Sequence, residues 1–155
     1  MNSGASPELR ALVEEHRRRL RRLISDHAEF LTRLETEAPT LVDREAAAVE
    51  RHSFYTGVEF ILRAIADAFD GAPSKSGDWH AELLRSATGP SPTRPRVLAA
   101  QTAESLRDFL VFRHRFRNLY GFELDWMLMS PLLRRMPATL RQFEGDLDVF
   151  LASCR

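Results

Sequence analysis

The strongest constraint on the fold is the spacing of glycine and proline, which leaves long stretches of chain without a turn residue. Between Pro7 and Pro39 there is neither glycine nor proline, and apolar side chains recur every three or four residues. That spacing places the apolar side chains on one face of a helix. Ser6 before Pro7 is typical of an N-cap followed by proline in the first turn. The pattern therefore predicts a first helix over residues 7–35.

Turn signals divide the rest of the chain into further helical segments. Thr40, followed three residues later by Asp43, resembles a capping box at the start of a second helix. Asp78 is a candidate cap for a third helix. The later helices are expected at about residues 41–69, 79–87, 99–119 and 131–150, the last with a candidate bend at Pro137.

The same patterns predict the fold class. No stretch shows the alternation of a strand, and long helices with short connections are typical of an up-and-down bundle. We therefore expect an all-α bundle of four to five helices in a single domain over residues 1–155. Residues 1–6 are expected to be flexible, and residues 70–78 and 88–96 are expected to form loops.

Composition disfavours several functional classes. The formal net charge is zero, so the chain as a whole is not an obvious polyanion binder. No apolar run approaches the roughly 20 residues of a membrane helix, and the first residues lack the regions of a signal peptide. The single cysteine, Cys154, cannot form an internal disulfide or a cysteine zinc site. We therefore expect a cytoplasmic protein without a membrane segment.

The basic residues are almost all arginines, with Lys75 as the only lysine. Arginine binds phosphates and carboxylates through paired hydrogen bonds. Residues 17–22 hold five arginines, which on a helix spread around most of the circumference. Two interpretations stay open. The run is either a binding surface for an RNA backbone or a solvated helix face paired with Glu14, Glu15 and Asp26.

Three of the five histidines stand singly on their predicted helices. His27, His52 and His80 have no second metal ligand three or four residues away, so we expect them to be structural. The sequence also has no glycine-rich phosphate loop and no Gly-x-Ser-x-Gly nucleophile turn. We therefore predict neither a metal site nor a cofactor.

Residues 112–120 bring three arginines, a histidine, an asparagine and a tyrosine to the expected end of a helix. Arg113 and Arg117 are four apart and share a face, and Tyr120 falls on roughly the same stripe. Asn118 follows Arg113 by five positions, which places it about 140° away on a straight helix. The two side chains can meet only if the helix frays or a second copy contributes. The alternative is that the arginines simply neutralise the negative end of the helix dipole.

This segment resembles a known motif. Arg113-His114-x-x-x-Asn118-x-Tyr120 is similar to the Arg-x4-6-His motif of the HEPN superfamily, and especially to the Arg-x4-His-x-Tyr form of HepT-type toxins. Residues 121–125 (Gly-Phe-Glu-Leu-Asp) resemble the usual continuation. Residues 53–59 (Ser-Phe-Tyr-Thr-Gly-Val-Glu) and 77–84 (Gly-Asp-Trp-His-x-x-Leu-Leu) also resemble one HepT-like branch. The resemblance spans roughly residues 45–150.

The resemblance implies a fold, an activity and partners. It implies a helical bundle that forms a homodimer or a higher even oligomer, with the motifs lining a shared cleft. It implies a toxin that cleaves RNA, such as tRNA or mRNA, without a metal ion. It also implies a small nucleotidyltransferase antitoxin that attaches AMP to the motif tyrosine, which would be Tyr120.

One position departs from the family pattern, because the motif histidine is replaced by Asn118. Metal-free RNA cleavage needs groups that take and give protons, whereas asparagine only forms hydrogen bonds. Arg113 would stabilise phosphate charge and Arg117 would contact RNA. His114 would then supply the acid or base, although it points about 100° from Arg113. Three explanations stay open: His114 or Tyr120 takes over, the chain binds RNA without cutting it, or the asparagine was introduced to make a toxin tolerable.

The leading hypothesis is a HepT-like ribonuclease toxin with Arg113, His114 and Asn118 at the catalytic position, Arg117 on the RNA and Tyr120 as the AMPylation site. The alternative is a catalytically impaired HEPN adaptor that binds a nucleotidyltransferase or RNA without cleaving it.

Overall fold

The computed structural model describes residues 4–72, 75–116, 120 and 124–154, and within them it confirms the all-α fold. These residues form six helices and no strand. The helices are α1 (Pro7–Asp26), α2 (Ala28–Arg33), α3 (Leu41–Asp70), α4 (Trp79–Ser86), α5 (Ala100–Phe116) and α6 (Trp126–Ser153). No helix of the described part is long and apolar enough to cross a membrane.

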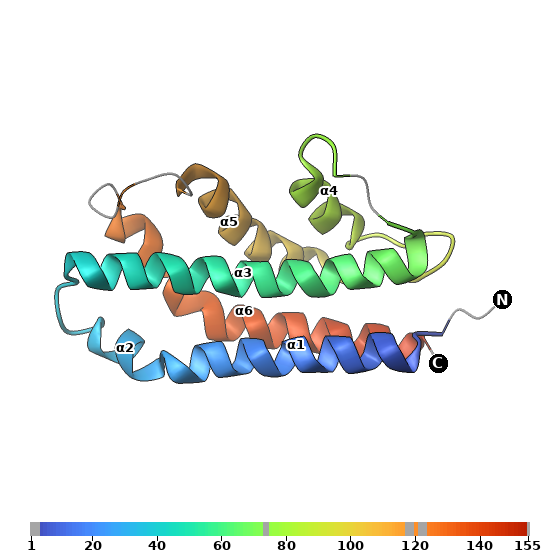
Figure 1. The fold of residues 1–155 in the computed structure, drawn as a ribbon, viewed down its shortest axis with the longest axis horizontal. Coiled ribbons are helices and arrows are strands. Elements are labelled where there is room, and N and C mark those ends of the chain that lie inside the picture. The colour runs from blue at the N-terminus through green and yellow to red at the C-terminus, as the bar shows by residue number, and fades with distance from the viewer. Residues whose placement is uncertain (1–3, 73–74, 117–119, 121–123, 155) are drawn as a thin grey trace.

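The helices are arranged around α3. Helices α1, α3 and α6 run along the long axis, whereas the shorter α4 and α5 pack on the opposite side of α3 from α1 (Figure 1). The two ends of the described chain are tied together at one end of the bundle, because the backbone amide of Ala5 donates to the carbonyl of Cys154 over 3.0 Å (Figure 1). Residues 1–3 of the segment expected to be flexible lie outside the described residues.

Local signals placed three helix starts correctly, each at a polar side chain that caps the helix. The Ser6 hydroxyl accepts from the amide of Leu9 at the start of α1. At the start of α3, Thr40 and Asp43 form the predicted capping box, with reciprocal bonds of 3.1 Å and 2.9 Å. Asp78 caps α4 as expected. Each cap satisfies amides that have no partner inside the first turn of a helix.

Two helix boundaries differ from the prediction. The expected first helix breaks at His27, whose backbone (φ −104°, ψ 5°) leaves the helical region while its ring bonds the carbonyl of Leu23 over 2.8 Å. The result is α1 followed by the separate α2, so the described chain has six helices instead of four to five. The last helix begins at Trp126 instead of residue 131, because the Asp125 carboxylate caps it through the amide of Met127.

Helix α6 contains two prolines inside its length, Pro131 and Pro137, and it bends along this part (Figure 1). Proline removes one helical hydrogen bond and its ring presses on the preceding turn, which favours a bend. The expected helix at residues 99–119 is observed as α5, and its predicted end at 117–119 lies outside the described residues.

The core is built where the apolar faces of α1, α3, α5 and α6 meet. Phe54 of α3 packs against Phe109 of α5 with ring centroids 5.1 Å apart. Gly57 lets α1 approach α3, because a Cβ atom at this position would lie 2.6 Å from Cδ2 of Leu20. This close contact fixes α3, which carries residues of the candidate site.

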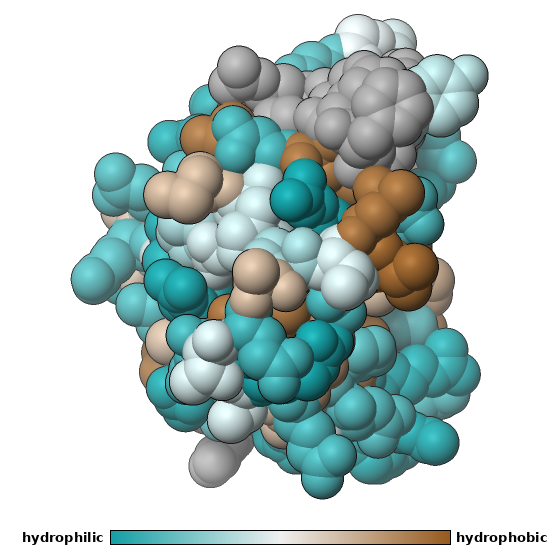
Figure 2. Space-filling view, turned by 90° about the vertical axis from the view of Figure 1, so that its left-hand side faces the viewer, coloured by the Kyte–Doolittle hydropathy of each residue, from teal (hydrophilic) through white to brown (hydrophobic). Residues whose placement is uncertain are grey.

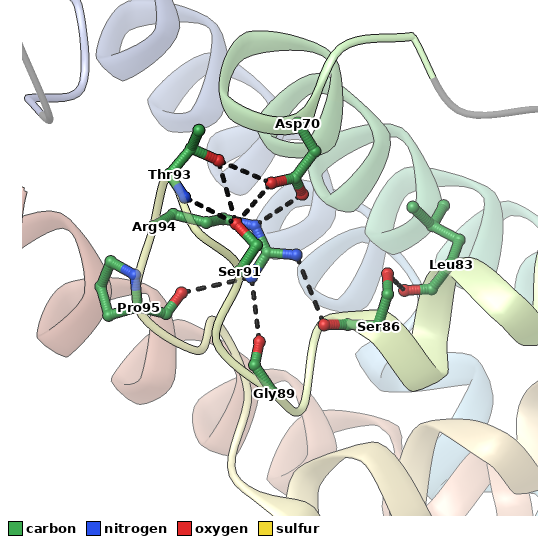
Figure 3. A network of polar contacts seen from close by, with 8 residues as sticks. All are labelled: Asp70, Leu83, Ser86, Gly89, Ser91, Thr93, Arg94 and Pro95. Atoms are coloured by element: carbon green, nitrogen blue, oxygen red, sulfur yellow. Dashed lines mark hydrogen bonds and ion pairs between the residues drawn. The ribbon is translucent and has the colours of Figure 1, made fainter.

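The loop between α4 and α5 is held by Arg94, whose side chain is almost completely buried. Its Nε atom donates to Asp70 at the end of α3 over 2.8 Å, and Nη2 donates to the carbonyl of Ser86 at the end of α4 over 3.3 Å (Figure 3). Its Nη1 atom donates to the carbonyls of Gly89 and Pro95. One guanidinium therefore ties the C-terminal end of α4 to α3.

Candidate functional site

Three stretches that lie far apart in the sequence meet on one side of the bundle. Glu59 comes from α3, Asp78 and His80 come from the start of α4, and Arg113 and His114 come from the last turn of α5. We call these five residues the Glu59 cluster. Helices α3, α4 and α5 all pack against one another, which brings the three stretches together.

The centre of the cluster is the carboxylate of Glu59, whose side chain is about 10% exposed. The Nδ1 atom of His80 lies 2.6 Å from Oε2 of Glu59, and Nη1 of Arg113 lies 3.4 Å from Oε1. A carboxylate that accepts from an imidazole and a guanidinium is a charge-assisted arrangement, stronger than neutral hydrogen bonds. Glu59 therefore holds both side chains in fixed positions.

His114 joins the cluster from a second side. Its Nε2 atom lies 3.8 Å from Oδ1 of Asp78, and its ring meets the ring of His80 edge to face, with centroids 5.5 Å apart. The sequence predicts that His114 points about 100° away from Arg113. Because Arg113 faces α3 and His114 faces the start of α4, both side chains reach the cluster despite that divergence.

Aromatic contacts support His80. The indole of Trp79 stacks on the His80 ring at a centroid distance of 3.7 Å, and the guanidinium of Arg63 lies 5.5 Å from the Trp79 ring. Such stacked and cation–π contacts restrict how a ring can turn. Within the cluster, His80 is 20% exposed and His114 is 38% exposed, so solvent reaches both imidazoles.

Burial and the charges of the cluster shift the pKa values of two neighbouring side chains, Tyr55 and His52. Burial raises the pKa of the Tyr55 hydroxyl, and the charge of Glu59 adds to this effect while Arg113 opposes it. Burial also lowers the pKa of His52, and the positive charges of Arg113 and Arg51 lower it further. Both groups are therefore kept in their neutral forms near neutral pH.

The remaining predicted site residues are placed as follows. Arg117 and Asn118 lie outside the described residues, so the structure does not address their positions. Tyr120 is described and is 71% exposed. Arg113 and His114 are brought together with each other and with residues of the two other stretches that resemble the HepT-like branch.

Arginines of the run in α1 pair with carboxylates in two ways, across to α6 and along α1 itself. Arg17 is buried and pairs with Glu144 and Asp148 of α6. The side chain of Arg21 also pairs with Glu144. Two exposed arginines pair four residues along the helix, Arg19 with Glu15 and Arg22 with Asp26. Arg17 and Arg21 therefore tie α1 to α6, whereas the pairs of Arg19 and Arg22 are those expected of a solvated helix face.

Sequence reasoning missed three members of the cluster. Glu59 and Asp78 were not singled out for chemistry, and His80 was expected to be structural. The signal that points to them is their membership of residues 53–59 and 77–84, the two stretches that accompany the Arg113 motif. Spacing alone does not reveal them, because Glu59 and His80 are 21 residues apart and Glu59 and Arg113 are 54 apart.

The chemistry that the cluster supports follows from its groups. A guanidinium can hold a phosphate, and two imidazoles can exchange protons near neutral pH. Within the described residues, no three His, Cys, Asp or Glu side chains converge as a metal ion would require.

Comparison with known proteins agrees with the motifs. The profile described as HepT-like protein matches residues 46–154, which is most of the chain and includes every residue of the Glu59 cluster. The chain therefore belongs to the HepT-like family. No curated protein and no solved structure matches the chain significantly.

Proposed function

Because the chain belongs to the HepT-like family, we propose that it is the toxin of a toxin–antitoxin pair, a metal-independent RNA endonuclease acting in the cytoplasm. The observation that carries this proposal is the joint placement of Arg113 and His114 in the Glu59 cluster. The two side chains combine a fixed positive charge with a group that transfers protons. These are the elements that phosphodiester cleavage without a metal requires.

In this proposal Arg113 binds the phosphate that is attacked and stabilises the charge of the transition state. Glu59 accepts from Nη1 of Arg113 over 3.4 Å and so fixes the guanidinium from one side. The other N–H groups of the guanidinium can then donate to a phosphate. His114, which is partly exposed, transfers a proton at the same phosphate. Arg117 is proposed to contact the RNA backbone, and Asn118 to contribute a hydrogen bond.

The test is incubation of the purified chain with total RNA, tRNA and mRNA in the presence of a chelator. We expect cleavage by the wild type and a loss of about 100-fold or more in Arg113→Gln, a typical effect of removing a group that stabilises transition-state charge. Arg107→Gln is the matched control, because Arg107 is exposed on the same helix. If neither the wild type nor Asn118→His cleaves any RNA, the ribonuclease proposal is wrong.

We also propose that a cognate nucleotidyltransferase attaches AMP to Tyr120. The chain has two tyrosines, and they differ sharply in access: Tyr55 is 1% exposed, whereas Tyr120 is 71% exposed. After incubation with ATP and the partner, peptide mass spectrometry should find AMP on Tyr120 and none on Tyr55. Absence of AMP from the wild type, or its persistence in Tyr120→Phe, would contradict the proposal.

A second candidate function is a catalytically impaired adaptor, favoured by Asn118 at the motif histidine position. Such a chain binds a nucleotidyltransferase or RNA and leaves the RNA intact. Co-purification of a partner together with unchanged RNA would support this function. Cleavage that disappears in Arg113→Gln would exclude it.

We further propose a homodimer or higher even oligomer through the end of the bundle at which α3 and α6 begin. Figure 2 shows this end, where apolar residues stand among hydrophilic ones. Near this end of the two helices, large exposed apolar side chains are Leu41, Val42, Val49, Met127 and Leu128. Burying such side chains on association is favourable.

The test compares a methionine and a valine of similar exposure at opposite ends of α6. Met127, at the start of α6, is 78% exposed, and Val149, near its other end, is 73% exposed. Light scattering should report an oligomer for the wild type and for Val149→Glu, and a monomer for Met127→Glu. A monomeric wild type would contradict the proposal.

A further inference from the structure

We propose that His80, oriented by Glu59, is the second proton-transfer group of the site and works as a pair with His114. This inference deepens the proposed ribonuclease function and rests on it. It assigns a base and an acid to a chain whose motif histidine is replaced by Asn118.

The contact between Glu59 and His80 has the form of an oriented general base. Over 2.6 Å, the Nδ1–H group of His80 donates to the Glu59 carboxylate. A carboxylate at Nδ1 fixes the tautomer, leaves the lone pair on Nε2, and stabilises the imidazolium that forms when Nε2 takes a proton. Glu59 therefore acts as a positioning residue, and Nε2 of His80 is the basic atom.

The surroundings of His80 keep this geometry while leaving the ring accessible. Trp79 stacks on the ring at 3.7 Å, and Glu59 is anchored in the middle of α3. The side chain of His80 is nevertheless 20% exposed, the same exposure as Arg113. The exposed part of the His80 ring therefore lies beside a cation that can hold a phosphate.

The distance between the two imidazoles suits one phosphate. The rings of His80 and His114 lie 5.5 Å apart, centroid to centroid, at an interplanar angle of 72°. Arg113, the neighbour of His114 in the chain, donates to the same carboxylate as His80. When Arg113 binds a phosphodiester of RNA, one imidazole would therefore lie near the attacking ribose 2′-hydroxyl. The other imidazole would lie near the leaving 5′-oxygen.

The proposed step balances as follows. Nε2 of His80 removes the proton of the ribose 2′-hydroxyl, and the 2′-oxygen forms a bond to phosphorus. The bond from phosphorus to the 5′-oxygen breaks, and protonated His114 gives its proton to that oxygen. The products are a 2′,3′-cyclic phosphate and a 5′-hydroxyl end, with His80 protonated and His114 neutral. Arg113 stabilises the charge on the non-bridging oxygens.

Charged groups reach this pair from every packed element. From α3, Glu59 faces His80, Arg63 lies over Trp79, and His52 lies close enough to Arg113 for its charge to be felt. From the segment before α4, Asp78 faces His114. From α5, Arg113 faces Glu59. The carboxylate beside each imidazole compensates the positive charge that each carries during the cycle.

The test is the pH dependence of cleavage for two matched substitutions. His80→Asn keeps an amide N–H near the position of Nδ1 for Glu59, and His114→Gln keeps one near the position of Nε2. Wild type should give a bell-shaped profile. His80→Asn should lose the rise on the acid side and His114→Gln the fall on the alkaline side, each with a rate lower by about 100-fold or more. His16→Asn, a histidine of α1 stacked on Phe60, is the control.

A second measurement separates base from acid and does not depend on the pH profiles. An RNA with sulfur in place of the bridging 5′-oxygen has a leaving group that departs without protonation. On this substrate His114→Gln should regain most of the wild-type rate, whereas His80→Asn should not. Glu59→Gln should lower the rate less than His80→Asn does. Circular dichroism melts confirm that each variant is folded.

The outcomes distinguish this inference from the proposed function. If Arg113→Gln is inactive while folded His80→Asn keeps the wild-type rate and profile, the His80 assignment is overturned and the ribonuclease stands. If the His114 variant gains nothing on the sulfur substrate, the acid assignment is overturned. If only Asn118→His cleaves RNA and the wild type does not, the inference is overturned. If neither cleaves RNA, the proposed function fails as well.

Discussion

Replacement of Arg94 by methionine should weaken the fold more than any surface change in the same loop. Arg94 is 6% exposed and donates to Asp70 over 2.8 Å and to the carbonyls of Gly89, Pro95 and Ser86 over 3.1–3.3 Å (Figure 3). Methionine fills much of the same volume but donates no hydrogen bond. The change therefore isolates the polar contacts of the guanidinium.

The magnitude follows from those contacts. Removing one partner of a buried ion pair costs about 3–5 kcal/mol, because the groups left behind lose their compensation. The side chain of Asp70 is 28% exposed and keeps its bonds from Ser91 and Thr93, so we expect a loss at the lower end of that range, about 3 kcal/mol. For a chain of this size, that corresponds to a fall of about 10 °C in Tm.

The assay is urea unfolding followed by far-UV circular dichroism, with Arg96→Met as the matched control. Arg96 is an exposed arginine of the same loop, and its replacement should change the free energy of unfolding by no more than about 0.5 kcal/mol. A loss below about 1 kcal/mol for Arg94→Met, or equal losses for the two variants, would refute the role given to Arg94.

The dependence of stability on acid pH should also report the contact between Arg94 and Asp70. Burial raises the pKa of Asp70, but hydrogen bonds from Ser91 and Thr93 and the charge of Arg94 outweigh this, so the pKa lies below its usual value. A carboxyl group with a lowered pKa in the folded state stabilises the fold above its unfolded pKa, and this contribution is lost as the pH falls through the folded pKa. Arg94→Met should lose part of this pH dependence.

Three further substitutions test local features of the bundle. Gly57→Ala should destabilise by about 1 kcal/mol, because overpacking against Leu20 outweighs the better helix propensity of alanine. Gly145→Ala, where nothing lies within 4 Å of the new Cβ, should instead stabilise by up to about 1 kcal/mol, and equal effects in urea unfolding would contradict the packing argument. Hydrogen bonds from Arg33 and from the backbone of Thr40 lower the pKa of Asp43 to about 2, so Arg33→Gln should raise it toward its usual value in a carbon NMR titration. Because the lowered pKa favours the folded state at neutral pH, the acid-unfolding midpoint of Arg33→Gln should move to higher pH, and an unchanged midpoint would contradict this link.

The features that the sequence predicts well are local. Ser6, Thr40 with Asp43, and Asp78 act within one turn of their own helix, so their spacing is enough to identify the caps. The predicted start of α6 at residue 131 lies five residues after the observed start at Trp126. Asp125 had already capped the helix, and the proline is tolerated inside it.

The break between α1 and α2 escaped prediction because residues 7–35 contain no glycine or proline after Pro7 to mark it. The ring of His27 supplies the local hydrogen bond at the break instead. The role of Arg17 depends on Glu144 and Asp148, more than 120 residues away, and no periodicity reveals such a pair.

In the candidate site, too, the sequence predicts the local motif and not the long-range contacts. Arg113 and His114 stand in a recognisable motif, and the two supporting stretches were identified beside it. What spacing does not give is that Glu59 and His80, from different helices, form one oriented pair beside Arg113. That information resides in the packing of α3, α4 and α5.

The most direct test of the account is cleavage of a short RNA of defined sequence and of the same RNA with a 2′-deoxynucleotide on the 5′ side of the cut. In the presence of a chelator, we expect the all-RNA strand to give fragments with 2′,3′-cyclic phosphate and 5′-hydroxyl ends, identified by mass spectrometry. The deoxy-substituted strand should stay intact at that bond. Cleavage of the substituted bond, or fragments with 5′-phosphate ends, would contradict attack by the 2′-hydroxyl and with it the proposed use of Arg113, His114 and His80.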